Sequence, residues 1–257
     1  MASLLRKPIT HISSGTHGFT YKLSYSFCGF ILEIGVKSVS NQEFGTVVWD
    51  AVSLIIKDDI RTLVRKYQAS EKHEVGSALG LCQYFEEQKM SFSQKKVIEL
   101  GAGTGILSIL TVLLGGDVTI TDKPQLLKQI EQNVSINIPS SFRPRVKIHA
   151  LSWGYDHTLF PSEYDYILGT DIMYTRASVP LILKTLQHLS NEKTVIYFAS
   201  KMSIGCGLVS SGYETLSQYF DSDLVYRYEN KDVNLYRMRK KAPNVETNLG
   251  SWNHKIV

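Results

Sequence analysis

The sequence has few of the residues that cross-link a chain or bind a metal. It contains only three cysteines, Cys28, Cys82 and Cys206, which lie far apart and form no CxxC or Cys/His pattern. An odd, scattered set argues against a disulfide framework and against a zinc site, and it suits a reducing compartment. We therefore expect no metal site and no structural disulfide.

Long apolar runs and a strong net charge are also missing. The longest apolar stretch, Ile106 to Leu114, is much shorter than the roughly 20 residues that a membrane helix needs. The first residues contain no apolar signal core. The net charge of +4 is weakly basic, and the scattered Lys and Arg residues do not indicate a nucleic-acid partner. These absences predict a soluble protein of the cytosol or the nucleus that is not attached to a membrane.

What is present is enough apolar sequence for one domain with an appendage. The chain has 257 residues, of which 43% are hydrophobic, and a chain of this length buries most of its surface. Residues 1–18 are polar and are expected to be a poorly ordered lead. Aromatic and β-branched patches between Phe19 and Val39 predict a pair of strands. The polar tail from Ala242 is expected to be loose.

From Lys96 onward, strand and helix patterns alternate. A strand–helix alternation with right-handed crossovers predicts an open α/β sheet. The last two strands are joined by Asn230–Asp232 without a helix, so the seventh strand should be antiparallel. We thus expect a Rossmann-like seven-stranded mixed sheet with an N-terminal β-strand extension. The predicted strands are 96–100, 117–121, 146–151, 164–169, 194–199, 223–228 and 233–238, and the predicted helices are 79–87, 106–114, 124–135, 178–189 and 211–220.

The most informative segment is a glycine turn followed by an acidic residue. The predicted strand ending in Glu99-Leu100 leads into Gly101, Gly103 and Gly105, and the next predicted strand presents Asp122 at its carboxyl end. Glycines at such a turn let the backbone approach a ligand closely. An acidic residue about 20 positions later can accept hydrogen bonds from ribose hydroxyls. The pattern predicts a nucleoside-containing cofactor.

The glycine spacing distinguishes two classes of such cofactor. A dinucleotide fingerprint reads Gly-x-Gly-x-x-Gly, and its third glycine packs the helix below a pyrophosphate. Here the spacing is Gly-x-Gly-x-Gly, which suits a pyrophosphate less well. The terminal strand hairpin and the lack of a second substrate domain also argue against a dehydrogenase.

These motifs together resemble methyltransferase family 16, and more narrowly the protein-lysine methyltransferases of the methyltransferase-like 21 type. The resemblance implies S-adenosylmethionine as cofactor and methylation of a lysine amine in a protein substrate, with chaperones or related ATPases as the expected partners of a monomeric enzyme. It covers roughly residues 19–238. The segments that carry it are Glu99–Gly105, Ile120–Asp122, Leu168–Tyr174, Gly45–Asp50, Leu81–Glu87, Asn133 with Asn137, and Leu151–Gly154.

The resemblance assigns one group of residues to the cofactor. Gly101, Ala102 and Gly103 should run beside its methionine and ribose portions. Asp122 should bind the ribose diol through charge-assisted hydrogen bonds, and its alternative role is the N-cap of the helix that begins at Pro124.

Three further positions belong to the same prediction. Glu99 is expected to reach the methionine ammonium through water or loop amides, with a purely structural role as the alternative. Trp49 and Trp153 are placed at the cofactor by the family pattern, although core packing is the commonest fate of tryptophan. The backbone of Thr170 should border the adenosyl group.

Asp171 and Tyr174 are the candidates for the lysine site. Methyl transfer is an in-line displacement in which positioning supplies most of the rate gain. A free lysine has a pKa near 10.4 and must lose a proton before it can attack. A positive sulfonium and a water-poor channel both favour the neutral amine. Asp171 would orient the amine or a neighbouring loop, and Tyr174 would form a wall of the channel.

Other functions are weighed against this one. Amino-methylating enzymes of nucleic acids carry prolines after the equivalent acidic residue, whereas this chain reads Asp171-Ile-Met-Tyr174. No aromatic-plus-basic stripe indicates single-strand binding. A different acceptor in the same fold remains an alternative, as does a pseudoenzyme that binds a chaperone-like partner, since fold does not fix function.

One segment departs from the family pattern. Val52–Ser77 separates Trp49-Asp-Ala51 from Ala78-Leu79, which the family joins directly. We interpret it as an insertion that interrupts the helix expected to support Trp49; a harmless surface excursion is the alternative. The predicted division is a lead and β extension (1–50), an insertion (51–77), a methyltransferase domain (78–241) and a tail (242–257).

Overall fold

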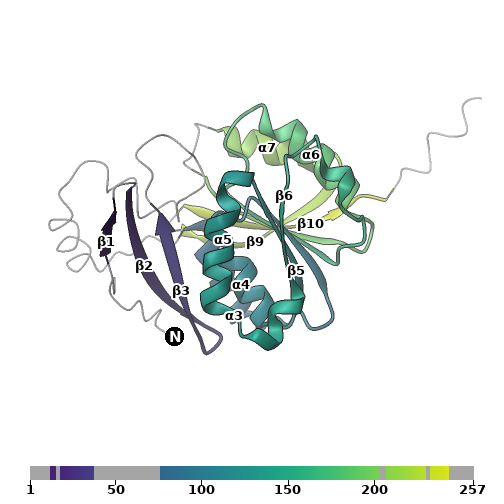
Figure 1. Cartoon of the computed structure of the whole chain (residues 1–257). Coiled ribbons are helices and arrows are strands. Elements are labelled where there is room, and N and C mark those ends of the chain that lie inside the picture. Colours follow the sequence, from purple (N-terminus) through teal and green to yellow (C-terminus); the bar gives the residue numbers. More distant parts are fainter. Residues whose placement is uncertain (1–11, 16–17, 38–75, 203–206, 230–231, 243–257) are drawn as a thin grey trace, which may run out of the picture.

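The computed structural model describes residues 12–15, 18–37, 76–202, 207–229 and 232–242, and it consists of a small β-sheet packed on an α/β unit (Figure 1). The α/β unit has a seven-stranded sheet in the order β6-β5-β4-β7-β8-β10-β9. Its strands are β4 (Lys96–Leu100), β5 (Asp117–Asp122), β6 (Val146–Ala150), β7 (Tyr166–Thr170), β8 (Val195–Lys201), β9 (Phe220–Tyr228) and β10 (Val233–Lys240).

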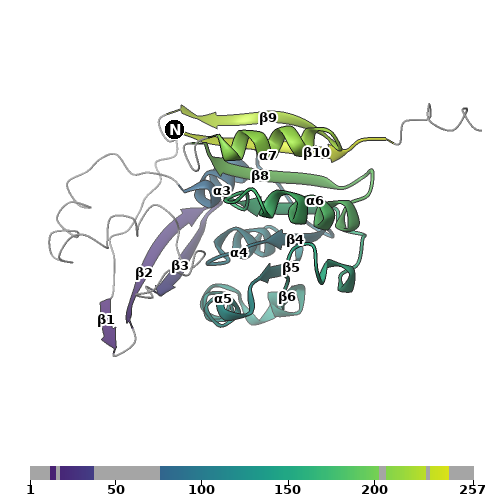
Figure 2. The ribbon, with the colours of Figure 1, turned by 90° about the horizontal axis from the view of Figure 1, so that it is seen from above.

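The direction of the strands confirms the predicted mixed sheet. β4 to β8 run parallel to one another. β10 pairs antiparallel with both β8 and β9, so it lies between two strands that precede it in the chain. Figure 2 shows the sheet fanned from β9 and β10 at one edge to β6 at the other.

Two helical layers cover the sheet. Alternate strand residues face opposite sides: Val97 and Leu168 contribute to one apolar cluster, and Ile98 and Ile167 to the other. Central parallel strands are therefore apolar on both faces, as parallel sheets require. The first layer is formed by α3 (Ser77–Glu87), α4 (Ile106–Leu113) and α5 (Pro124–Asn137), and the second by α6 (Ser178–Leu189) and α7 (Leu208–Ser217).

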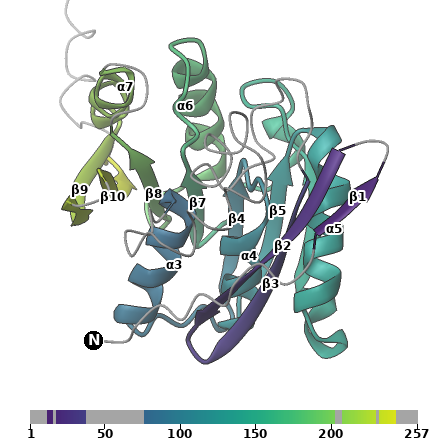
Figure 3. The same cartoon turned by 90° about the vertical axis from the view of Figure 1, so that its left-hand side faces the viewer.

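The three-stranded sheet forms an outer layer on the first group of helices. It contains β1 (Ile12–Gly15), β2 (Gly18–Phe27) and β3 (Phe30–Lys37), all antiparallel. Figure 3 shows β2 and β3 lying over α4 and α5, and their buried side chains Leu32 and Ile34 join the same apolar cluster as those helices. The predicted N-terminal β extension is thus confirmed.

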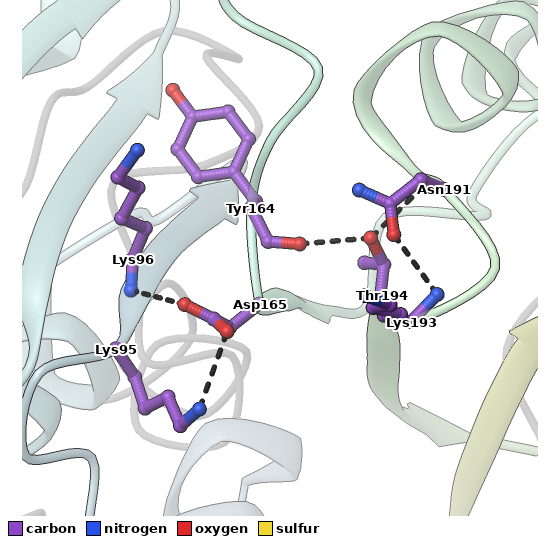
Figure 4. A network of polar contacts seen from close by, with 7 residues as sticks. All are labelled: Lys95, Lys96, Tyr164, Asp165, Asn191, Lys193 and Thr194. Carbon is purple, nitrogen blue, oxygen red and sulfur yellow. Dashed lines mark hydrogen bonds and ion pairs between the residues drawn. The ribbon is translucent and has the colours of Figure 1, made fainter.

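A polar network fixes the amino ends of three central strands (Figure 4). The Asp165 carboxylate accepts from the Lys96 backbone N–H at 2.8 Å and from Lys95 Nζ at 3.3 Å, so β7 is tied to β4. On the other side, Thr194 Oγ1 donates to the Tyr164 carbonyl at 2.8 Å, just before β8 begins. With the amino end of β7 held from both sides, its register and hence its carboxyl end are fixed.

Several predicted boundaries need correction. Residues 12–15, assigned to a poorly ordered lead, form β1, because they pair with Gly18–Tyr21 of β2. The helix predicted at 211–220 spans Leu208–Ser217 instead, and Phe220 begins β9 with its side chain fully buried. The hydrophobic pattern of 211–220 did not reveal that turn.

The start of α3 also differs from prediction. The helix begins at Ser77 rather than at Leu79, with Gly76 as its N-cap residue. Most of the predicted insertion, together with Trp49, lies outside the described residues. Within the described ranges no helix combines the length and apolar character needed to cross a bilayer.

Candidate active site

A cavity of about 460 Å³ opens at the carboxyl ends of the central strands. Two groups of predicted residues meet there, the proposed cofactor residues and the proposed lysine-site residues. Eight of the ten predicted positions line the cavity; Glu99 does not, and Trp49 lies outside the described residues. The eight are Gly101, Ala102, Gly103, Asp122, Trp153, Thr170, Asp171 and Tyr174.

The glycine turn takes the backbone through left-handed conformations. Gly101, Gly103 and Gly105 have φ values of 65°, 59° and 78°, which glycine adopts without strain. A Cβ on Gly101 would lie 3.0 Å from Trp153 Cζ2 and 3.1 Å from Ile172 Cγ2. The indole and the turn can approach each other this closely only because position 101 carries no side chain.

Asp122 organises this turn from the end of β5. Its Oδ2 accepts from the Gly103 N–H at 2.7 Å, and its Oδ1 accepts from the Lys123 N–H at 2.7 Å. Burial raises the pKa of Asp122, while these two backbone hydrogen bonds oppose the rise. The helix-cap alternative is not observed, because Lys123 is the N-cap residue of α5 and no side chain caps this helix. The Asp122 carboxylate has further lone pairs that can accept hydrogen bonds from ribose hydroxyls.

Glu99 is buried beneath the turn rather than exposed to the cavity. One carboxylate oxygen accepts from the Ser108 N–H at 3.1 Å and from the Ser108 hydroxyl, both on α4. Burial raises the pKa of Glu99 to about 8, the Ser108 hydrogen bonds oppose this rise, and the charge of Asp122 adds to it. The geometry favours the structural alternative, in which Glu99 holds the first turn of α4.

The loop that carries Trp153 is anchored on α6. The Gly154 N–H donates to Thr185 Oγ1 at 2.8 Å, and Lys184 Nζ donates to the Gly154 carbonyl at 2.9 Å. Gly154 has φ 79°, and a Cβ there would lie 2.6 Å from Leu181 Cδ2. The loop therefore rests directly on the helix. It holds the Trp153 ring 6.2 Å from that of Tyr174, centroid to centroid.

Asp171 stands immediately after β7 in a left-handed conformation, with φ 52°. Its N–H donates to the Ala199 carbonyl at 2.9 Å, and its Oδ1 accepts from the Lys201 N–H at 3.0 Å. Short polar residues tolerate this conformation better than other non-glycine residues do. The backbone thus leaves the strand direction at Asp171, and the carboxyl group of this residue lies at the cavity wall.

The sequence did not indicate Ser77, which also lines this cavity. Its hydroxyl donates to Asp171 Oδ1 at 2.8 Å across 94 positions of sequence. The only available signal was its place directly before the Ala78-Leu79 helix pattern, and Ser77 itself was assigned to the end of an insertion. Lys123, Ile172 and Leu181 line the cavity as well; the first two directly follow the predicted residues Asp122 and Asp171.

The described side chains that line the cavity form no cluster of metal ligands. Among the residues that the structure describes, no group of three or more His, Cys, Asp or Glu side chains could hold a metal ion. The cavity instead combines the glycine turn, the two carboxylates of Asp122 and Asp171, and three aromatic rings. Such a lining suits a nucleoside with a short charged extension.

The family model and two similar proteins that match this chain carry the description lysine methyltransferase. The family model described as "Lysine methyltransferase" matches residues 32–222. A relative from Xenopus tropicalis named EEF1A lysine methyltransferase 3 is 42% identical over 222 residues, covering 86% of this chain and 87% of its own. A relative from Danio rerio named protein N-lysine methyltransferase METTL21A is 36% identical over 178 residues, covering 66% and 78%.

Solved structures agree at the level of the fold. The glycopeptide N-methyltransferase MtfA aligns with a TM-score of 0.52 at 13% identity, over 64% of this chain and 90% of its own. Its complex with S-adenosyl-L-homocysteine aligns with a TM-score of 0.51 at 12% identity, over 71% and 98%. At such identities the likeness concerns the fold alone.

Proposed function

The chain belongs to the lysine methyltransferase family, and we propose that its cavity joins an S-adenosylmethionine site to a channel for the side chain of a protein lysine. The reaction is methyl transfer to that lysine amine. The observation that carries the proposal is that Asp122 with the glycine turn, and Asp171 with Tyr174, line one cavity. A cofactor site and an acceptor site must share a space for an in-line transfer.

The residues fit the cofactor. The turn at Gly101 and Gly103 provides a cradle that side chains would fill, and Asp122 provides the acceptor for a ribose diol. Trp153, held by the loop on α6, offers an aromatic face for a nucleobase. When bound, S-adenosylmethionine supplies a methyl group on a positively charged sulfonium.

The remaining residues prepare the acceptor. Asp171 orients the lysine amine, since its carboxylate is fixed at the cavity wall by hydrogen bonds from other elements. Tyr174 is assigned to the wall of the lysine channel; its ring lies 6.2 Å from that of Trp153, centroid to centroid, and both residues line the cavity. A site with little water disfavours the charged ammonium and so lowers the pKa of the lysine, which favours the neutral amine that attacks.

The protein substrate is a finer proposal. The relatives with 42% identity over most of the chain are named for EEF1A, whereas the relative named METTL21A is 36% identical over 66% of the chain. We therefore propose EEF1A as the substrate. A chaperone or related ATPase, as the sequence resemblance suggested, is the other outcome that the test distinguishes.

The test is a methylation assay on defined and undefined substrates. The purified full-length protein is incubated with methyl-labelled S-adenosylmethionine and with purified EEF1A, a purified chaperone or tissue lysate. Labelled bands are digested, and mass spectrometry locates the methylated lysine. Label in EEF1A supports the proposal, and label only in a chaperone replaces the proposed substrate. Cofactor binding by calorimetry with no labelled protein in lysate would favour the pseudoenzyme.

A further inference from the structure

We propose that Ser77 is a positioning residue of the methyl-transfer site, which fixes the orientation of the Asp171 carboxylate. The inference rests on the proposed function, because it assigns a new residue to the same acceptor site. Neither the glycine motif nor the Asp171-Ile-Met-Tyr174 motif includes this position. What points to it is a hydrogen bond between two elements that are distant in sequence.

Two donors converge on one oxygen of Asp171. Ser77 Oγ donates to Oδ1 at 2.8 Å, and the Lys201 N–H donates to the same oxygen at 3.0 Å. The first donor comes from the start of α3 and the second from the end of β8. Hydrogen bonds to an ionised acceptor are roughly twice as strong as neutral ones. With Oδ1 held from two directions, the plane of the carboxylate is set.

The hydroxyl of Ser77 is not used by its own helix. Serine near a helix start commonly caps backbone N–H groups, but α3 has no side-chain cap, and its N-cap residue is Gly76. Ser77 is 2% exposed, and a buried hydroxyl is costly unless it is hydrogen-bonded. The partner that satisfies it is the carboxylate of Asp171, across the cavity wall from the helix.

The rest of α3 makes Ser77 a rigid support. The Tyr228 hydroxyl on β9 donates to the Gly80 carbonyl at 3.1 Å, and a Cβ on Gly80 would lie 3.2 Å from the Tyr228 ring. Phe85, one turn further along, is fully buried, and its ring packs edge-on against Tyr197 of β8 at 5.8 Å. The first residue of α3 is therefore held relative to the sheet that carries Asp171 and Lys201.

Ser77 belongs to the segment Val52–Ser77, which we interpreted as an insertion relative to the family pattern. Ser77 is the last residue of Val52–Ser77, and a direct junction of Ala51 to Ala78 would place a methyl group there. A methyl group cannot donate a hydrogen bond. In this chain, the residue directly before Ala78-Leu79 is therefore one whose hydroxyl reaches Asp171.

The experiment compares Ser77→Ala, Ser77→Thr and the control Ser135→Ala in the full-length protein. Ser135 is exposed on α5 and donates only to the Gln132 carbonyl of its own helix. Each variant is measured for kcat, for KM of the protein substrate, for cofactor Kd by calorimetry and for Tm. We expect kcat of Ser77→Ala to fall by about tenfold, as expected when one charge-assisted contact is lost in the transition state. The cofactor Kd should stay unchanged, and Ser77→Thr should restore most of the loss.

The outcomes separate this inference from the proposed function. No methylation by the unmodified protein would overturn the proposed function and this inference with it. Full kcat in Ser77→Ala, with an active unmodified protein, would overturn the positioning role alone. A fall in activity that follows a lower Tm and weaker cofactor binding, without rescue by Ser77→Thr, would also overturn it, because Ser77 would then serve only the stability of α3.

Discussion

Asn133 on α5 joins Gly35 of the N-terminal sheet to the glycine turn of the cavity. Its Oδ1 accepts from the Gly35 N–H at 2.8 Å, and its Nδ2 donates to the Gly35 carbonyl at 3.1 Å and to the Thr104 carbonyl at 2.9 Å. Asn137 makes the same paired contact with Glu33, at 2.6 and 2.8 Å. Asn133 and Asn137 are four residues apart on a helix, a rise of about 6 Å, and Glu33 and Gly35 are two residues apart on a strand, a rise of about 6.6 Å. The two amides therefore lie opposite alternate residues of β3.

Replacing these asparagines should separate stability from cofactor binding. Asn133→Ala and Asn137→Ala each remove a paired amide contact with β3, and the loss of one such hydrogen bond should lower the unfolding free energy by about 0.5–1.5 kcal/mol. Only Asn133 also contacts Thr104, which lines the cavity. Cofactor affinity by calorimetry should therefore fall severalfold in Asn133→Ala and remain unchanged in Asn137→Ala. Equal affinities in the two variants would contradict the link.

Asp171→Ala tests the acceptor site. The substitution removes the carboxylate that Ser77 and Lys201 hold, and it leaves Asp122 and the glycine turn intact. We expect methylation in the labelled assay to be abolished while calorimetric cofactor affinity stays within about twofold, since the lost contact acts only on the acceptor. Retained turnover would exclude the assigned role.

Gly154→Ala should damage the site through the Trp153 loop. Besides a left-handed φ, the new Cβ would meet Leu181 at 2.6 Å from Cδ2 and 3.2 Å from Cα. Gly29→Ala is the matched control, because Gly29 has the same φ of 79° and nothing within 4 Å of a Cβ. Overpacking should make Gly154→Ala about 1–3 kcal/mol less stable than the control. Cofactor affinity should weaken in Gly154→Ala alone.

The raised pKa of Glu99 predicts a pH-dependent stability. The ordinary value is 4.5 and the folded value about 8, so between these values the unfolded chain releases a proton that the native protein keeps. The contribution of Glu99 to the unfolding free energy is therefore largest below pH 4.5 and declines as the pH rises towards 8. Above pH 8 it no longer changes with pH. The Tm of Glu99→Gln relative to the unmodified protein should increase across this window. The exposed Glu131→Gln serves as control and should show no such trend.

Much of the fold could be predicted from the sequence because its helices and strands follow local hydrophobic patterns. Buried parallel strands such as Val97–Leu100 are continuous apolar runs, and helix α6 repeats apolar residues at Val179, Ile182, Leu186 and Leu189. The position of β10 could not be predicted in the same way. A hairpin of β9 and β10 satisfies the same pattern whichever of the two strands pairs with β8.

The site was predicted in part for the same reason. The glycine turn and Asp122 are joined by one strand–helix–strand unit, so their spacing in sequence fixes their spacing in the fold. Ser77 and Asp171 are 94 positions apart, and no periodicity links them. For Glu99 the sequence left a contact with the cofactor and a purely structural role open, and alternation along β4 directs its side chain towards Ser108.

The place of β10 in the sheet has a consequence for how the chain is made. β9 leaves the ribosome before β10, yet β10 is its only strand neighbour in the described structure. Until residues 233–240 emerge, both β8 and β9 present an unpaired edge, and Leu224 and Tyr226 of β9 are apolar and exposed even in the finished fold. Unpaired apolar edges are templates for aggregation. Nascent chains that stall between β9 and β10 should therefore depend on a chaperone, whereas chains released after Lys240 can complete the sheet unaided.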